Sequence, residues 1–106
     1  MERLIACLEA GDARLRQESR RLAAGGRGDE GDLAKIRANV YGICKSAFQT
    51  LGPERGKTRL TELKSTWETA LFAAREHGDV KKAVIEEIKL ETLAEIGTEL
   101  ERVKEV

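Results

Sequence analysis

The sequence predicts an all-α protein, and more specifically an antiparallel up-and-down four-helix bundle. Strong helix formers (Ala, Leu, Glu, Lys and Arg) dominate the chain, and aromatic residues make up only 4% of it. No stretch alternates apolar and polar residues in the manner of a half-buried strand. Apolar residues instead recur every three or four positions, which is the spacing of one face of a helix.

Glycine residues mark the breaks between the expected helices. Residues 25–31 are glycine-rich, and Gly52 precedes the only proline, Pro53. Gly78 suits the left-handed position that closes a helix, and Asp79 suits the N-cap of the next one. Similar lengths and short connections favour one bundle domain spanning all 106 residues. The expected helices cover residues 1–24, 32–51, 53–77 and 79–105.

The first expected helix contains a possible interruption at Gly11-Asp12. This dipeptide resembles the Gly-Asp pair at residues 78–79, so it could divide the helix into two short pieces. Leu8 and Leu15 nevertheless stay in the same helical register across it. We expect a continuous helix, with the broken one as the alternative.

Each expected helix carries one apolar stripe that needs a partner. The polar residues on the rest of each helix surface should face water. The stripe residues are Met1, Leu4, Ile5, Leu8, Leu15 and Leu22 in the first helix; Leu33, Ile36, Val40, Ile43, Cys44, Ala47 and Leu51 in the second; Leu60, Leu63, Trp67, Ala70, Leu71 and Ala74 in the third; and Val84, Ile85, Ile88, Ile96, Leu100 and Val103 in the fourth.

Residues 52–58, Gly-Pro-Glu-Arg-Gly-Lys-Thr, resemble a phosphate-binding loop in their letters. A functional loop needs four residues between its glycines, a preceding strand and backbone N–H donors around the phosphates. Only three residues separate Gly52 from Gly56, Pro53 has no N–H, and a helix precedes the turn. We interpret this segment as a helix-to-helix connection, with Glu54 favouring the positive end of the next helix.

Charge and hydropathy exclude some partners. Lys and Arg number 19, as do Asp and Glu, so the net charge is zero and nucleic acid is not an expected partner. No run approaches the length of a membrane span, so no membrane partner is expected. The start of the chain is too short and too acidic for a secretory signal. We therefore expect a cytoplasmic protein of bacterial type.

The residues available for catalysis are few. His77 is the only histidine, and it falls at the end of a helix, where it complements the negative helix terminus. Cys44 lies in an apolar stripe and should be buried and inert, and Cys7 lies beside its stripe. Their offset along a helical hairpin exceeds the reach of a disulfide, so we predict two free thiols. We expect no enzyme activity, no metal and no cofactor.

Weak second faces on the helices indicate protein–protein contact. Ala38, Gly42 and Ser46 form a strip of small residues opposite the stripe of the second helix, where another helix could approach closely. Phe72 points away from the stripe of the third helix, and Leu90 lies on the back of the fourth. We expect a protein that acts by protein–protein interaction, most simply as a homodimer, with these five residues as candidate interface. The alternative is that these positions are ordinary solvated faces.

A second hypothesis is a small-ligand or anion-binding regulatory module. Arg37 is the one charged residue well inside an apolar stripe, and a buried Arg needs an acidic partner or a bound anion. Tyr41 lies at the edge of the same stripe, so Arg37 and Tyr41 are the candidate ligand contacts. The plainer alternative is that Arg37 snorkels to water and Tyr41 packs with its hydroxyl solvated.

An acidic row on the fourth helix has two interpretations. Acidic side chains at a spacing of four residues repel one another mildly within a helix. The row either faces water or docks against basic side chains, from this chain or from another copy. Its members are Glu87, Glu91, Glu95 and Glu99.

Overall fold

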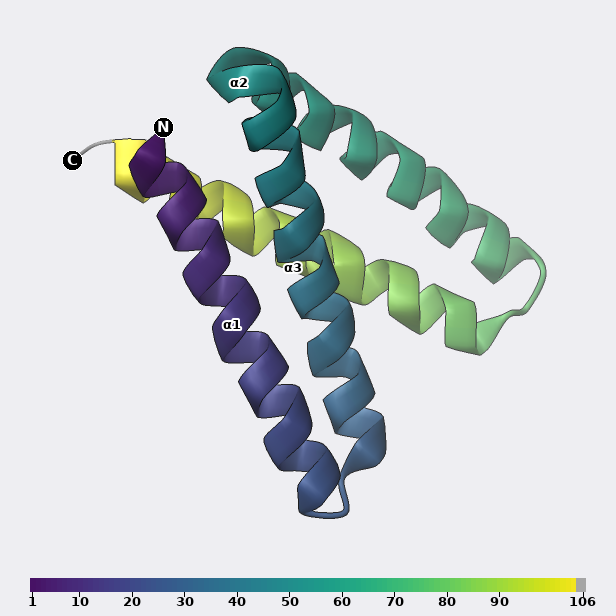
Figure 1. Ribbon diagram of the computed structural model, residues 1–106. Coiled ribbons are helices and arrows are strands. Elements are labelled where there is room, and N and C mark those ends of the chain that lie inside the picture. The colour runs from purple at the N-terminus through teal and green to yellow at the C-terminus, as the bar shows by residue number, and fades with distance from the viewer. Residues whose placement is uncertain (105–106) are drawn as a thin grey trace.

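The structure is a computed structural model that describes residues 1–104, and every regular element within that range is a helix. Helix α1 spans Glu2–Ala24, α2 spans Gly28–Glu76 and α3 spans Val80–Lys104 (Figure 1). The all-α prediction is therefore confirmed, and α1 is continuous across Gly11-Asp12. The expected helix end at residue 105 and the end of the expected domain at 106 lie outside the described residues.

The four separate helices expected from the sequence are not confirmed, because α2 runs through the break at Gly52. Helix α2 spans Gly28–Glu76 as two helical segments that meet at a kink, where Gly52 has non-helical angles of φ 84° and ψ 177°. Only glycine adopts this left-handed region readily, and Pro53 then starts the next helical turn. The expected connection between two helices is thus a sharp kink at Gly52-Pro53, with no separate loop.

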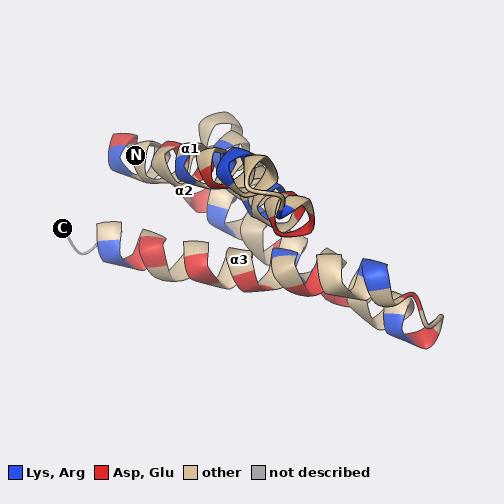
Figure 2. Cartoon of the chain, turned by 90° about the horizontal axis from the view of Figure 1, so that it is seen from below, with Lys and Arg blue, Asp and Glu red and all other residues tan. Residues whose placement is uncertain are grey.

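The chain forms two helical hairpins that cross. The first hairpin, residues 2–51, pairs α1 with the N-terminal half of α2; the second hairpin, residues 53–104, pairs the C-terminal half of α2 with α3 (Figure 1). Figure 2 shows α3 in a layer separate from α1 and crossing beneath it. The molecule measures 39 × 35 × 22 Å, so its thin dimension equals about two helix diameters.

The turns between helices are short and follow local chemistry. Gly26 has φ 81° and Gly78 has φ 67°, the left-handed angles expected at helix ends. His77 is the C-cap residue of α2, as predicted. Asp79 Oδ1 accepts a hydrogen bond from the backbone N–H of Lys82 at 3.1 Å, which makes Asp79 the predicted N-cap of α3.

Helix α2 begins four residues earlier than expected, at Gly28 instead of residue 32. Glycine is a poor helix former, so propensity alone favours a loop here. Tertiary packing overrides it: Gly31 is buried, and a Cβ at this position would lie 2.8 Å from the carbonyl oxygen of Ser19. Ser19 Oγ also donates a hydrogen bond to the carbonyl oxygen of Gly31 at 2.7 Å. The two helices therefore approach closely, and only glycine fits between them.

One continuous core joins the two hairpins. It contains large side chains that are at most 1% exposed, among them Leu8 from α1, Tyr41 and Phe48 from α2, and Ile96 from α3. Three residues assigned to apolar stripes lie largely outside this core: Met1 is 53% exposed, and Ile43 and Val84 are each 41% exposed. A single stripe per helix therefore overestimates what crossing hairpins bury, because the helices diverge away from their crossing point.

Candidate interaction surfaces

The outer face of the second hairpin carries an apolar hollow. Its volume is about 300 Å³, and it lies between the C-terminal half of α2 and the middle of α3. Polar side chains at its edge are Thr61, Lys64 and Glu68. The apolar residues that line it are Leu60, Leu90, Leu93, Ala94 and Gly97. Leu90, which the sequence indicated as a candidate interface residue, is therefore half-buried at the wall of this hollow.

Phe72 extends the same outer face toward the turn at residues 77–79. It follows Glu68 by four residues, so the two side chains share one side of α2. Phe72 is 65% exposed, the second-highest exposure among the large hydrophobic residues that the structure describes, after Val80 at 75%. A Cβ added at Gly97 would meet no heavy atom within 4 Å, so the hollow is open at that point. We refer to Phe72, Leu60, Leu90, Ala94 and Gly97 as the outer apolar face.

The prediction that Ala38, Gly42 and Ser46 form an outer face for another molecule is wrong. Ala38 is fully buried, at 0% exposure, inside the core. Gly42 lies against α1, where an added Cβ would be 3.6 Å from Asp12 Oδ2. Of the strip, only Ser46 is exposed. The strip does allow a helix to approach closely, but that helix is α1 of the same chain.

Tyr41 is not an accessible ligand contact. Its side chain is 1% exposed, and its hydroxyl donates a hydrogen bond to Glu99 Oε1 at 3.0 Å instead of meeting water. Burial, followed by the hydrogen bond to Glu99, raises the pKa of Tyr41 to about 12. Arg37 lies one turn before Tyr41 on the same helix, α2, and is half-buried. The structure thus removes Tyr41 from the predicted Arg37–Tyr41 ligand patch.

Both cysteines are free thiols, as predicted. Cys44 is fully buried, and burial raises its pKa to about 12, so it remains a protonated, inert thiol at neutral pH. Cys7 is half-buried, and its Sγ donates to Glu99 Oε2 at 3.7 Å. Burial and the Glu99 carboxylate raise the pKa of Cys7, which makes it a poor nucleophile.

The acidic row of α3 is divided between two environments. Figure 2 shows acidic residues recurring along α3. Glu99 faces the first hairpin, where it accepts hydrogen bonds from Tyr41 and Cys7. Glu87 forms an exposed ion pair with Arg75 Nη2 at 2.8 Å. The intervening Glu91 and Glu95 are exposed. The row is therefore neither one solvated face nor one docking surface, because α3 turns its side chains from solvent into the core along its length.

The segment that resembles a phosphate-binding loop forms a wall of a different hollow. Pro53, Glu54 and Lys57 line a cavity of about 290 Å³ together with Leu4 of α1 and Leu100 of α3. This cavity lies where the start of α1, the kink of α2 and the end of α3 meet (Figure 1). Gly56 is buried, and an added Cβ would lie 2.6 Å from Phe48 Cδ1. The second glycine of the segment therefore serves aromatic packing.

Two packing contacts escaped the sequence interpretation. Gly11 is buried in α1 beneath the ring of Tyr41, and an added Cβ would overlap that ring. The sequence offered a signal, since a glycine in a continuous amphipathic helix indicates close approach of another element.

The second contact is an ion pair on α3. Glu86 is only 5% exposed, and Lys89 Nζ lies 3.1 and 3.3 Å from its two carboxylate oxygens. The same Nζ lies 5.1 Å from the centre of the Trp67 ring. No apolar pattern indicated this buried ion pair.

Within residues 1–104, no three His, Cys, Asp or Glu side chains converge in the manner of a metal site. No helix in the same range is long and apolar enough to cross a membrane. Comparisons with protein-family models, with curated proteins and with solved structures find no match for this chain. The inference about function therefore depends on the surfaces described above.

Proposed function

We propose that this protein acts through protein–protein contact, as a homodimer joined by the outer apolar face of its second hairpin. The observation that carries the proposal is the open hollow of about 300 Å³ with Phe72 exposed on the same side. An apolar hollow with polar residues at its edge, beside an exposed aromatic side chain, favours an interaction site. We further propose a cytoplasmic location, because both cysteines are unpaired.

The shape of the chain supports an additional packing partner. Its radius of gyration is 14.5 Å, whereas a compact chain of about this length has a value of about 13 Å. Among residues 1–104, no element covers the outer side of the second hairpin (Figures 1 and 2). Two helices alone bury only one side of each other. Face-to-face packing of two second hairpins would create a four-helix arrangement between two copies, distinct from the single-chain bundle expected from the sequence.

Charge complementarity supports a second copy as the occupant. Lys64 and Glu68 border the hollow one helical turn apart. A two-fold axis between them would place Lys64 of each copy opposite Glu68 of the other, since a two-fold interface repeats every contact in reverse. A partner whose contacting side chains all had one charge could pair with Lys64 or with Glu68, but not with both.

The proposal is tested by the Gly97→Arg variant. A Cβ at position 97 would meet no heavy atom within 4 Å in the free chain, and replacing a helical glycine favours the helix. The arginine would, however, fill the hollow and prevent a second copy from entering it. Light scattering should give twice the chain mass of 11.7 kDa for the unmodified protein and the single mass for the variant.

The matched control is Thr98→Arg, at the next residue of α3, which is exposed and outside the hollow. This variant should keep the dimeric mass. If the unmodified protein remained monomeric at high concentration, the homodimer would be excluded. A dimer that survives Gly97→Arg would show that copies meet at another surface.

The ligand-binding alternative at Arg37 and Tyr41 is less favoured. Tyr41 is buried and its hydroxyl is already engaged by Glu99. An incoming ligand would have to displace a hydrogen bond to a charged group, which costs more than a neutral one. We also propose a non-catalytic role, because the two thiols have raised pKa values and His77 is an exposed cap residue.

A further inference from the structure

A basic hollow lies on the first hairpin, away from the outer apolar face. Its volume is about 230 Å³, and its lining residues are Arg16, Ser19 and Arg20 of α1 with Lys35 of α2. No acidic side chain lines it. Three cations that surround one hollow repel one another, and an anion placed among them would relieve that repulsion.

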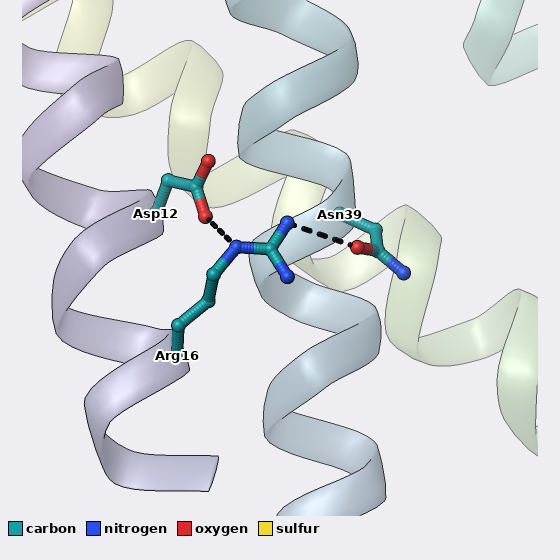
Figure 3. Close-up of polar contacts among 3 residues, drawn as sticks. All are labelled: Asp12, Arg16 and Asn39. Carbon is teal, nitrogen blue, oxygen red and sulfur yellow. Dashed lines mark hydrogen bonds and ion pairs between the residues drawn. The ribbon is translucent and has the colours of Figure 1, made fainter. Parts of the chain in front are cut away.

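Arg16 is held in a fixed orientation at the edge of this hollow. Its Nε donates to Asp12 Oδ1 at 2.6 Å, and its Nη2 donates to Asn39 Oδ1 at 3.1 Å. Figure 3 shows the other terminal nitrogen pointing away from both partners. The guanidinium is planar and rigid, so two contacts fix the direction of the remaining donors. Those donors are therefore oriented before any ligand arrives, which lowers the entropic cost of binding.

The other two cations have unused capacity. Within residues 1–104, neither Arg20 nor Lys35 forms an ion pair, and both side chains are exposed. Asp12 is engaged with Arg16 and does not line the hollow. The hollow is therefore lined by three cations, and in the described part of the chain only Arg16 among them is ion-paired, with Asp12. Arg presents several N–H donors in a planar fork that matches the oxygens of a phosphate group.

We propose that this hollow binds a small phosphate-bearing anion, with Arg16, Arg20 and Lys35 as its direct contacts and Asn39 as a positioning residue. The volume suits a compact group such as phosphate or diphosphate. Ser19 contributes less, because its hydroxyl already donates to the carbonyl of Gly31. The site is independent of the proposed dimer, because it lies on the other hairpin.

Titration with diphosphate at low ionic strength tests the proposal, with binding measured by calorimetry and by amide chemical shifts. The unmodified protein should bind saturably, with shifts concentrated around Arg16, Arg20 and Lys35. In the double variant Arg20→Gln, Lys35→Gln, the dissociation constant should rise by about tenfold or more. Both side chains are exposed, so circular dichroism should show an unchanged helical fold.

The matched control removes the same two charges elsewhere. Lys81 and Lys82 are exposed on α3, in the second hairpin. The double variant Lys81→Gln, Lys82→Gln should bind diphosphate within about twofold of the unmodified protein. If both double variants bound diphosphate equally weakly, the loss of affinity would follow from net charge alone. That result would contradict the proposed site. Absence of saturable binding, or tighter binding of a single-stranded oligonucleotide than of diphosphate, would overturn it as well.

Asn39→Ala tests the positioning role. The change leaves all three cations in place but removes the contact that fixes Arg16 Nη2. Diphosphate should bind several-fold more weakly, and the Nε–H resonance of Arg16 should shift before any ligand is added. Unchanged affinity would remove Asn39 from the proposal, and an unchanged Arg16 resonance would contradict the fixed orientation.

Discussion

The two hairpins use the same kind of amphipathic helix to different ends. In the first, helices approach closely because glycines lie at the contacts: Gly11 beneath Tyr41, and Gly31 against the backbone of Ser19. In the second, Gly97 faces open space and Phe72 faces water. Gly11 and Gly31 thus permit close approach of the two helices of the first hairpin, whereas Gly97 lies at an open surface of the second.

The hairpins also differ in their ionisable groups. The side chains whose pKa is raised by burial, Cys7, Tyr41 and Cys44, all belong to the first hairpin. The corresponding buried charge in the second hairpin, Glu86, is paired with Lys89. The first hairpin therefore buries groups that stay protonated at neutral pH, whereas the second buries a carboxylate that forms an ion pair. Three experiments test how the two hairpins differ in packing and in buried protonated groups, in order of decreasing effect.

The two phenylalanines provide the largest expected contrast. Phe48 is 0% exposed at the junction of both hairpins, and Phe72 is 65% exposed on the second. Phe48→Ala should lower the free energy of unfolding by about 3–5 kcal/mol, because it removes a buried ring and leaves a cavity. Phe72→Ala should change it by less than about 0.5 kcal/mol.

Each substitution should be made separately in the Gly97→Arg variant, and its urea unfolding should be measured there. In that background, association of two copies does not contribute to the free energy of unfolding. Trp67, which is buried near the core, reports unfolding by fluorescence. Similar losses from the two substitutions would show that the outer apolar face is buried within the single chain. That outcome would also remove the main support for the proposed dimer.

Alkaline pH should destabilise the protein through Tyr41, a residue of the first hairpin whose hydroxyl bonds to Glu99 of the second. The pKa of Tyr41 is about 12 in the folded protein, against about 10 in an unfolded chain. Below pH 10 both states keep the proton, so the associated stability is fully present. Between about pH 10 and 12 the unfolded chain releases its proton first, and the free energy of unfolding falls by about 2–3 kcal/mol.

The Tyr41→Phe variant isolates this contribution. It lacks the titrating hydroxyl, so its urea midpoint should fall less than that of the unmodified protein between pH 8 and pH 12. Cys44 also has a folded pKa of about 12, so its own loss begins near pH 9 and should persist in Tyr41→Phe. Parallel pH profiles of the two proteins would contradict the raised pKa of Tyr41.

The sequence was sufficient for the features that depend on local chemistry. Apolar spacing predicted helices, and Gly52-Pro53 and Gly78-Asp79 predicted where the chain turns, because each needs only its own backbone angles. The free thiols also followed, since they depend on helical register. What the sequence did not specify was the crossing of the two hairpins, because a stripe identifies the buried face of a helix but not which helix covers it.

The errors in the candidate site have the same origin. Ala38 lies opposite the stripe of its helix and was expected to be exposed, but this half of α2 contacts both α1 and α3 and so buries more than one face. Tyr41 was placed at an edge for the same reason. Phe72 behaved as expected because its helix has one neighbour along that length. The one-stripe assumption holds only where a helix packs on one side.

The smallest expected effect, and the most direct comparison of the hairpins, comes from one substitution made at two glycines. In a helix interior, replacing Gly by Ala gains up to about 1 kcal/mol from propensity. Gly97→Ala should realise this gain, because its Cβ meets no atom within 4 Å. Gly11→Ala should instead lower the free energy of unfolding by about 1–2 kcal/mol, because overpacking against the buried Tyr41 ring exceeds the gain.

Urea unfolding of the two variants, at a dilution where light scattering shows single chains, compares them directly. The ring of Tyr41 cannot move aside freely, since its hydroxyl is tied to Glu99 on α3. The double variant Gly11→Ala, Tyr41→Leu should recover part of the lost stability, because a smaller side chain leaves room for the methyl group. If Gly11→Ala instead stabilised the protein as much as Gly97→Ala, the first hairpin would not be closed by glycine contact, and the proposed distinction between the hairpins would fail.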